Sequence, residues 1–205
     1  MDADHRFTND WFEAARRAWD AIVADWRPSR ILEIGSYEGR GSCYFIDAVA
    51  SNPQSEVHCV DTWEGGIEHG DIPMGDVEQR FHHNTRIALE NTPKIVKLKV
   101  HKGQSDRVLA RLLAEGYGEY FDVVYVDGSH QAPDVLCDAV LGFRLVRVGG
   151  LMAFDDYLWA EVLPGGRDPL RCPRPAIDAF YAMYFRKLRQ LPLLPIQVYF
   201  EKTAA

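Results

Sequence analysis

Short apolar runs alternate with amphipathic segments along most of this chain, and few folds accommodate that order. Runs rich in β-branched residues predict strands, and segments with a 3.6-residue period predict helices. Strands that alternate regularly with helices are typical of an α/β fold, a mostly parallel sheet with helices on both faces. The predicted strands are 30–35, 56–61, 95–103, 121–127, 150–156 and 196–202, and the predicted helices are 11–26, 42–52, 77–90, 105–116, 133–146 and 176–191.

Charge and composition narrow the classes of partner. The chain of 205 residues carries 23 basic and 30 acidic residues, a formal net charge of −7, and 47% of its residues are hydrophobic. A net negative charge disfavours a nucleic acid, whose phosphates need lysine and arginine, and favours a small-molecule partner. A chain of this length fits a single domain over 1–205 with a substantial core.

Neither a targeting segment nor a membrane anchor is expected. The N-terminal stretch MDADHRFTNDWFEAARR lacks the apolar core of a signal peptide, and the chain has no run of about 18 apolar residues. Cys43, Cys59, Cys137 and Cys172 form no CxxC pair, which favours reduced thiols over a disulfide framework or metal cluster. We therefore expect a cytoplasmic protein. The apolar helix 11–26 offers a face to a second subunit, so a homo-oligomer is left open.

The carboxyl ends of the strands are the expected location of the functional site, because ligands of such sheets bind there, near the point where strand order reverses. Two irregular segments, 62–76 and 157–175, follow predicted strands and are rich in glycine and proline. They carry Trp63 and Trp159, which suits loops that cover a substrate. The alternative is that they are variable surface loops without function.

The turn after the first strand, EIGSYEGRGS, contains three glycines that let a ligand approach the backbone at the start of the next helix. Their spacing is G-x-x-x-G-x-G, which differs from the G-x-G-x-x-G of dinucleotide binders. Glu33, just before the turn, suits a cationic ligand better than a pyrophosphate. Asp61 ends the second strand about 20 residues later, where a carboxylate accepts hydrogen bonds from a ribose diol. The alternative for Asp61 is a local helix or turn cap.

Together these stretches resemble the class I S-adenosylmethionine-dependent methyltransferases. ILEIGSYEGRGS is similar to their first motif, VHCVDTWEG to their ribose-binding strand, HKGQSDRVL to their adenine-side turn, FDVVYVDGSH to their fourth-strand motif and VGGLMAFDDY to their fifth-strand motif. The resemblance implies a doubly wound, Rossmann-like, mostly parallel sheet with an antiparallel C-terminal strand. It divides the chain into an N-terminal helix region (1–29), a cofactor-binding core (30–160), and a loop, last helix and terminal strand (161–205).

The resemblance also implies a site for S-adenosylmethionine. Its methionine end is expected at the glycine turn, its ribose at Asp61 and its adenine between Gln104 and Ser105. Trp63 is expected to lie against the base or the sulfur-bearing chain. The expected cofactor set is Glu33, Gly35, Ser36, Gly39, Gly41, Ser42, Asp61, Thr62, Trp63, Gln104, Ser105 and Asp127.

The C-terminal segment departs from the family pattern of two antiparallel strands after the last helix. LPLLPIQVYFEK leaves little room for the first of them, and Pro192 and Pro195 interrupt it. A short or irregular sixth strand is therefore expected.

Three aspartates match the metal ligands of some class I O-methyltransferases. Asp127 matches their fourth-strand ligand, and the pair Asp155–Asp156 is similar to that of macrocin-type sugar O-methyltransferases. Carboxylate oxygens suit Mg²⁺ or another hard divalent cation. Neighbouring residues on a strand point to opposite faces, so both members of the pair reach one ion only if the strand has ended. The alternative is that Asp155 bonds locally while Asp156 is solvated.

His130 follows Asp127 by three positions and is the expected general base, since the catechol-type relatives place a lysine there. An imidazole can take a proton from a metal-polarised hydroxyl near neutral pH. The resemblance thus predicts metal-assisted O-methylation of a sugar, polyol or phenol, with Asp127 and His130 as catalytic residues. Metal-independent O- or N-methylation, a nicotinamide-dependent oxidoreductase, and a cofactor-binding protein without turnover remain alternatives.

Overall fold

The computed structural model describes residues 4–50, 52, 54–70, 72–193 and 196–205. Its centre is a seven-stranded sheet with the order β3-β2-β1-β4-β5-β7-β6. The first five strands along the chain pair in parallel, and β7 is antiparallel to both β5 and β6. The strands are β1 (Arg30–Ile34), β2 (Glu56–Asp61), β3 (Lys97–Lys102), β4 (Phe121–Val126), β5 (Val146–Phe154), β6 (Leu188–Gln190) and β7 (Val198–Lys202).

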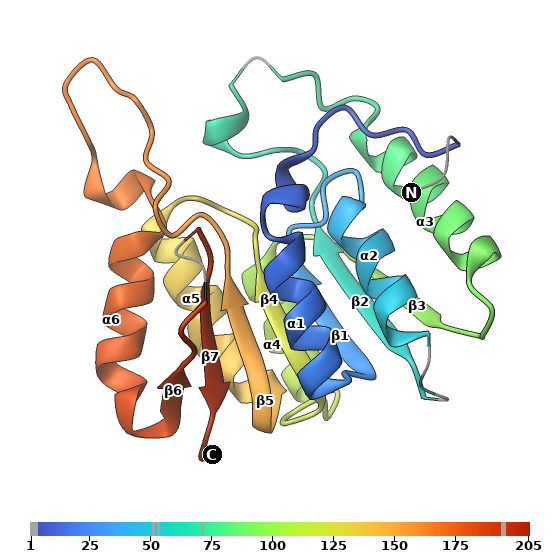
Figure 1. The fold of residues 1–205 in the computed structure, drawn as a ribbon. Helices are drawn as coiled ribbons and strands as arrows, with labels where there is room; N and C mark the ends of the chain where they lie inside the picture. Colours follow the sequence, from blue (N-terminus) through green and yellow to red (C-terminus); the bar gives the residue numbers. More distant parts are fainter. Residues whose placement is uncertain (1–3, 51, 53, 71, 194–195) are drawn as a thin grey trace.

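Helices cover both faces of the sheet, as the alternating pattern predicts (Figure 1). One apolar core lies between the sheet and α1, α2 and α3, and a second lies between the sheet and α4, α5 and α6. The α-helices are α1 (Arg16–Trp26), α2 (Arg40–Val49), α3 (Val77–Asn91), α4 (Ser105–Ala114), α5 (Ala132–Leu145) and α6 (Arg174–Tyr184). Short 3₁₀ turns are η1 (Trp11–Ala14), η2 (Ile67–His69), η3 (Pro169–Arg171) and η4 (Phe185–Lys187). The expected doubly wound α/β fold is therefore confirmed.

The two ends of the chain differ in detail from the sequence-based expectations. The predicted helix 11–26 is divided into η1 and α1. The predicted helix 176–191 is wrong beyond Tyr184, where the chain passes through η4 into β6. The 3.6-residue period continues through this stretch, but pairing with β7 takes Leu188, Arg189 and Gln190 into the sheet. Tertiary pairing overrides a local helical pattern here.

The expected short sixth strand is confirmed, since β6 has three residues. It lies before the stretch that contains Pro192 and Pro195. Pro195 is outside the described residues. Ser51 and Asp71, which belong to the predicted helix 42–52 and loop 62–76, are also outside them. All four cysteines are free thiols. Among the described helices none has the length and apolarity of a membrane span.

The order of the strands reverses between β1 and β4, and this point positions the functional site. The loops that follow β2 and β5 rise beyond the carboxyl ends of the parallel strands, at the top of Figure 1. The N-terminal segment crosses the same end of the sheet before η1 (Figure 1). The structure therefore gathers loops from distant parts of the sequence around one edge.

Candidate active site

A cavity of about 1050 Å³ opens at the carboxyl ends of β1, β2, β4 and β5. This volume is at the upper end of the range for small-molecule sites, so a cofactor and an acceptor both have room. Its wall contains nine of the twelve residues expected to bind the cofactor. These are Glu33, Gly35, Ser36, Gly41, Asp61, Thr62, Gln104, Ser105 and Asp127.

Gly35 is required by the close approach of two strand ends at the reversal point. Its φ angle is +87°, and a Cβ atom built on it would lie 1.9 Å from the carbonyl oxygen of Asp127. The backbone N–H of Asp127 donates to the carbonyl of Ile34 over 2.8 Å, which holds the two strands in register beyond β1. A side chain at position 35 would separate the glycine turn from the turn after β4.

Glu33 lies beneath the glycine turn and is 1% exposed. Its Oε2 accepts hydrogen bonds from the hydroxyls of Ser36, at 2.8 Å, and Ser42. Burial raises the pKa of Glu33 to about 7, against the lowering effect of these hydroxyls. Gly41 leaves space for Oε1, because a Cβ there would lie 2.4 Å from it. The carboxyl group thus orders the turn from below, and a cationic ligand beside it would favour its ionised form.

Asp61 fixes the same turn from the end of β2. Its Oδ2 accepts from the backbone N–H groups of Ser36 and Tyr37, both over 2.8 Å, and its Oδ1 accepts from Trp63 N over 2.7 Å. A carboxylate has about four acceptor positions, so roughly one remains on Oδ1 for a ribose hydroxyl. Most acceptor positions of Asp61 are therefore used to cap the turn, as the alternative interpretation of this residue expects. Binding of ribose stays a prediction.

Gly39, Ser42 and Trp63 do not belong to the cavity wall, although they were expected in the cofactor set. Trp63 is 5% exposed, donates from Nε1 to the carbonyl of Tyr37 over 2.9 Å, and packs on Phe81. Trp63 and Ser42 therefore support the glycine turn from behind. Their positions next to Asp61 and Gly41 in the sequence do not reveal on which side of the turn they lie.

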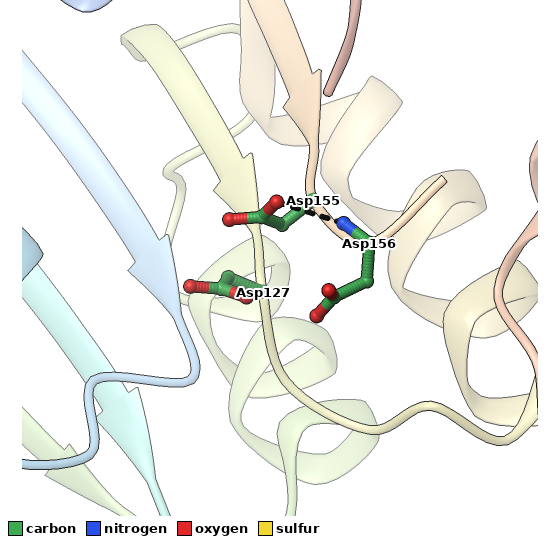
Figure 2. Close-up of side chains that lie close together, drawn as sticks. All are labelled: Asp127, Asp155 and Asp156. Atoms are coloured by element: carbon green, nitrogen blue, oxygen red, sulfur yellow. Dashed lines mark hydrogen bonds between the residues drawn. The ribbon is translucent and has the colours of Figure 1, made fainter. Parts of the chain in front are cut away.

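Asp127, Asp155 and Asp156, hereafter the aspartate triad, converge at the ends of β4 and β5 (Figure 2). Each offers one carboxylate oxygen, and these three oxygens lie within 4.8 Å of one another. Asp156 has a φ angle of +55°, so the strand has ended and the alternation of faces no longer applies. The N–H of Asp156 donates to Asp155 Oδ1 over 2.8 Å. This is the local hydrogen bond of Asp155 that the alternative to a metal site expects. Asp156 nevertheless turns toward the other two carboxylates.

Polar side chains behind the triad hold Asp155 in place. Its Oδ2 accepts from the hydroxyl of Tyr125 and from Gln197 Nε2, the latter over 2.7 Å. The hydroxyl of Tyr125 also lies 2.9 Å from Asp127 Oδ2. The hydroxyl of Tyr199 donates to Gln197 Oε1, which leaves the amide nitrogen directed at Asp155. Gln197 and Tyr199 come from the C-terminal end of the chain, and no local sequence motif indicates this role.

Burial and mutual repulsion raise the pKa of two triad members. The pKa of Asp127 is raised by burial and then by the charges of Asp155 and Asp156. The pKa of Asp155 is raised by burial and then by Asp156. Three carboxylates at this spacing repel one another, and a divalent cation between them would offset the repulsion. The oxygen-only ligand set fits a hard ion such as Mg²⁺.

His130 lies beside the triad on the turn between β4 and α5. Its Nε2 is 2.8 Å from Asp156 Oδ2, and its ring packs on Trp159 with centroids 4.2 Å apart. Both His130 and Trp159 belong to the cavity wall. The structure therefore brings the expected base next to the expected metal ligands, and Trp159 comes from the loop 157–175 predicted to cover a substrate.

The N-terminal segment forms one side of the cavity, which the sequence did not reveal. Residues 9–15 belong to the wall, and so do Tyr37 and His69. Thr8 is fastened to Glu38 by two hydrogen bonds, from its N–H over 2.7 Å and from its hydroxyl over 2.8 Å. Arg40 donates to the carbonyl of Asn9. These contacts join residues about 30 positions apart, so no periodic pattern predicts them.

A family model for a methyltransferase domain matches residues 32–157, which is more than half of the chain. The chain belongs to the methyltransferase domain family. With this sheet and glycine turn it is a class I S-adenosylmethionine-dependent methyltransferase. None of the curated proteins matches it.

Several solved structures share the fold of this methyltransferase. MycE is a methyltransferase of mycinamycin biosynthesis that was solved with Mg, S-adenosylhomocysteine and mycinamycin VI. It is 22% identical to this chain, with a TM-score of 0.61. The match covers 97% of this chain but about half, 51%, of MycE. TomG from Streptomyces achromogenes, an O-methyltransferase of tomaymycin synthesis, is 18% identical with a TM-score of 0.65 over 92% of this chain and 79% of TomG. CalS11, a TDP-rhamnose 3'-O-methyltransferase, is 17% identical with a TM-score of 0.66 over 94% of this chain and 81% of CalS11. At these identities the likeness establishes the fold.

Proposed function

We propose that this methyltransferase transfers a methyl group to a hydroxyl oxygen of a small molecule, assisted by a divalent cation. The observation that carries the proposal is the convergence of the aspartate triad beside a glycine-lined cavity. MycE, which has the same fold, was solved with Mg and S-adenosylhomocysteine, and this supports the assignment. TomG and CalS11, which share the fold, are O-methyltransferases.

The residues of the chain would divide the work as follows. The turn containing Gly35, Ser36 and Tyr37 would hold the methionine end of S-adenosylmethionine over Glu33, and Gln104 and Ser105 would flank the adenine. A cation held by the aspartate triad would lower the pKa of a coordinated acceptor hydroxyl. His130 would accept the proton, with Asp156 2.8 Å away to stabilise the imidazolium. Fixing the oxygen in line with the methyl group supplies much of the acceleration.

Chelation tests the proposal. We expect EDTA to abolish turnover of vicinal diols and Mg²⁺ to restore it, while S-adenosylhomocysteine binding measured by calorimetry persists. Asp155→Asn should behave like the chelated enzyme, because it removes one triad carboxylate and leaves the glycine turn intact. Activity that is insensitive to chelator would rule out the metal.

Methylation without a metal is the second candidate, and the 2.8 Å contact between His130 Nε2 and Asp156 Oδ2 favours it. A carboxylate that orients an imidazole is a sufficient arrangement for a general base. In that case His130→Ala should abolish turnover, whereas Asp155→Asn should retain it. Asp155→Asn thus separates the candidates, because His130 is the base in both.

A further inference from the structure

The charge of the cavity wall restricts which acceptors can enter. Nine carboxylate side chains belong to the wall, compared with one guanidinium and no lysine among the described residues. The guanidinium is that of Arg40, whose two terminal nitrogens are already engaged by Glu13 Oε1, at 3.2 Å, and the carbonyl of Asn9. Recognition of phosphate or carboxylate relies on arginine, lysine or free backbone N–H groups. The described wall therefore offers an anionic acceptor little to bind.

Cofactor and cation do not neutralise this wall. The sulfonium and ammonium of S-adenosylmethionine are partly offset by its own carboxylate, so the cofactor would add one net positive charge above Glu33. A divalent cation would face the triad, whose three carboxylates exceed its two charges. Asp10 and Asp134 remain on the wall. Asp134 accepts a hydrogen bond from the hydroxyl of Ser129 over 2.8 Å, and the described residues place no lysine or arginine in an ion pair with either aspartate.

Aromatic rings on the same wall also favour uncharged or cationic ligands over anions. The rings of Trp11 and Tyr37 lie 5.3 Å apart, and Tyr37 stacks on His69 at 5.6 Å. Trp11 is 58% exposed and belongs to the cavity wall. The face of an aromatic ring carries negative charge, so it attracts cations and the C–H groups of sugars and repels anions. This observation is independent of the carboxylates and points in the same direction.

We propose that the acceptor is an uncharged or cationic hydroxyl compound, such as a neutral glycoside, an aminosugar or a phenolic amine, and that acceptors carrying phosphate or carboxylate are rejected. This inference rests on the proposed function, because it concerns the acceptor of the same site. It separates the chain from an enzyme for nucleotide-linked sugars, although CalS11, which acts on TDP-rhamnose, shares its fold.

Three catechols that share the vicinal diol and differ in charge provide the test. They are dopamine, 4-methylcatechol and 3,4-dihydroxybenzoate, measured by calorimetry on the enzyme loaded with S-adenosylhomocysteine and Mg²⁺ at low ionic strength. We expect the benzoate to bind on the order of tenfold more weakly than the other two, with a difference that shrinks as salt is added. Equal or tighter binding of the benzoate would overturn the proposal.

Inorganic pyrophosphate extends the test to an anion that needs no diol pocket. We expect no binding at millimolar concentration to the same loaded enzyme, and measurable binding in the cavity, competitive with dopamine or with the cofactor, would overturn the proposal. If none of the catechols binds while S-adenosylhomocysteine and Mg²⁺ do, catechols are excluded as acceptors of this site, and pyrophosphate alone decides the question of charge. Failure of S-adenosylhomocysteine or Mg²⁺ to bind counts against the proposed function itself.

A charge variant with a matched control localises the effect. Asp134→Asn should narrow the difference between dopamine and 3,4-dihydroxybenzoate, because it removes one wall carboxylate. Asp25→Asn makes the same change in charge at an exposed position of α1 outside the cavity and should leave the difference unchanged. An equal effect of both variants would show that net charge, rather than the cavity wall, sets the preference, and would overturn the assignment to this wall.

Discussion

Replacing Gln197 by leucine is expected to weaken divalent-cation binding while the cofactor still binds. Gln197 Nε2 donates to Asp155 Oδ2 over 2.7 Å, and its Oε1 accepts from the hydroxyl of Tyr199. The side chain is buried and is not part of the cavity wall. Leucine has a similar size and cannot donate, so Asp155 would lose one of the two donors that hold its Oδ2.

The magnitude follows from the lost bond. A hydrogen bond to an ionised group contributes about 1.5–3 kcal/mol, which corresponds to roughly a 10- to 150-fold change in an equilibrium constant. A second estimate agrees with the first. Loss of a group that orients a metal ligand typically reduces the affinity for the metal about 10- to 100-fold. We therefore expect the Kd for Mn²⁺, measured from the free-ion EPR signal, to rise by about 10- to 100-fold.

A matched variant separates this effect from general damage. Gln190→Leu makes the same substitution at an exposed position of β6 and should leave Mn²⁺ affinity unchanged. Binding of S-adenosylhomocysteine should survive in both variants. An unchanged Mn²⁺ affinity in Gln197→Leu would show that the bond from Gln197 to Asp155 does not support metal binding. A parallel loss of S-adenosylhomocysteine binding would show that the whole site has collapsed.

Three further predictions concern stability. Gly35→Ala should cost at least about 3 kcal/mol in a urea titration, because left-handed strain adds to a Cβ contact of 1.9 Å with Asp127; a cost below about 1 kcal/mol contradicts it. Lys202→Met should cost about 2–4 kcal/mol, since the buried ammonium donates to two carbonyls near the end of α5 and to Glu119; an unchanged urea midpoint contradicts it. Burial raises the pKa of Asp138 to about 7. The folded state therefore binds this proton more tightly than the unfolded state does. The free energy of unfolding of the wild type should fall relative to that of Asp138→Asn as pH rises from about 4 to 7. A difference that stays constant over this window contradicts the last prediction.

Several strands of the sheet follow closely from the sequence, although β5 begins four residues before its predicted start and β6 lies within a predicted helix. β1, β2 and β4 lie within one residue of the predicted ranges, because buried parallel strands are apolar runs whose pattern is local. The end of the last helix could not be predicted this way. Residues 185–190 keep a helical period, and only the presence of β7 beside them makes β6 the better solution.

The class of fold, the glycine turn and the two positions where acidic residues follow β4 and β5 are all evident from the amino-acid sequence. These are local features, since a strand that ends in a carboxylate or a glycine does so whatever surrounds it. Three other features emerge only from the folded chain. Trp63 supports the turn from behind, the positive φ of Asp156 brings it to the triad, and Gln197 holds Asp155 from the far end of the chain. The orientation of a side chain and its long-range partners depend on packing between distant segments, which no local pattern encodes.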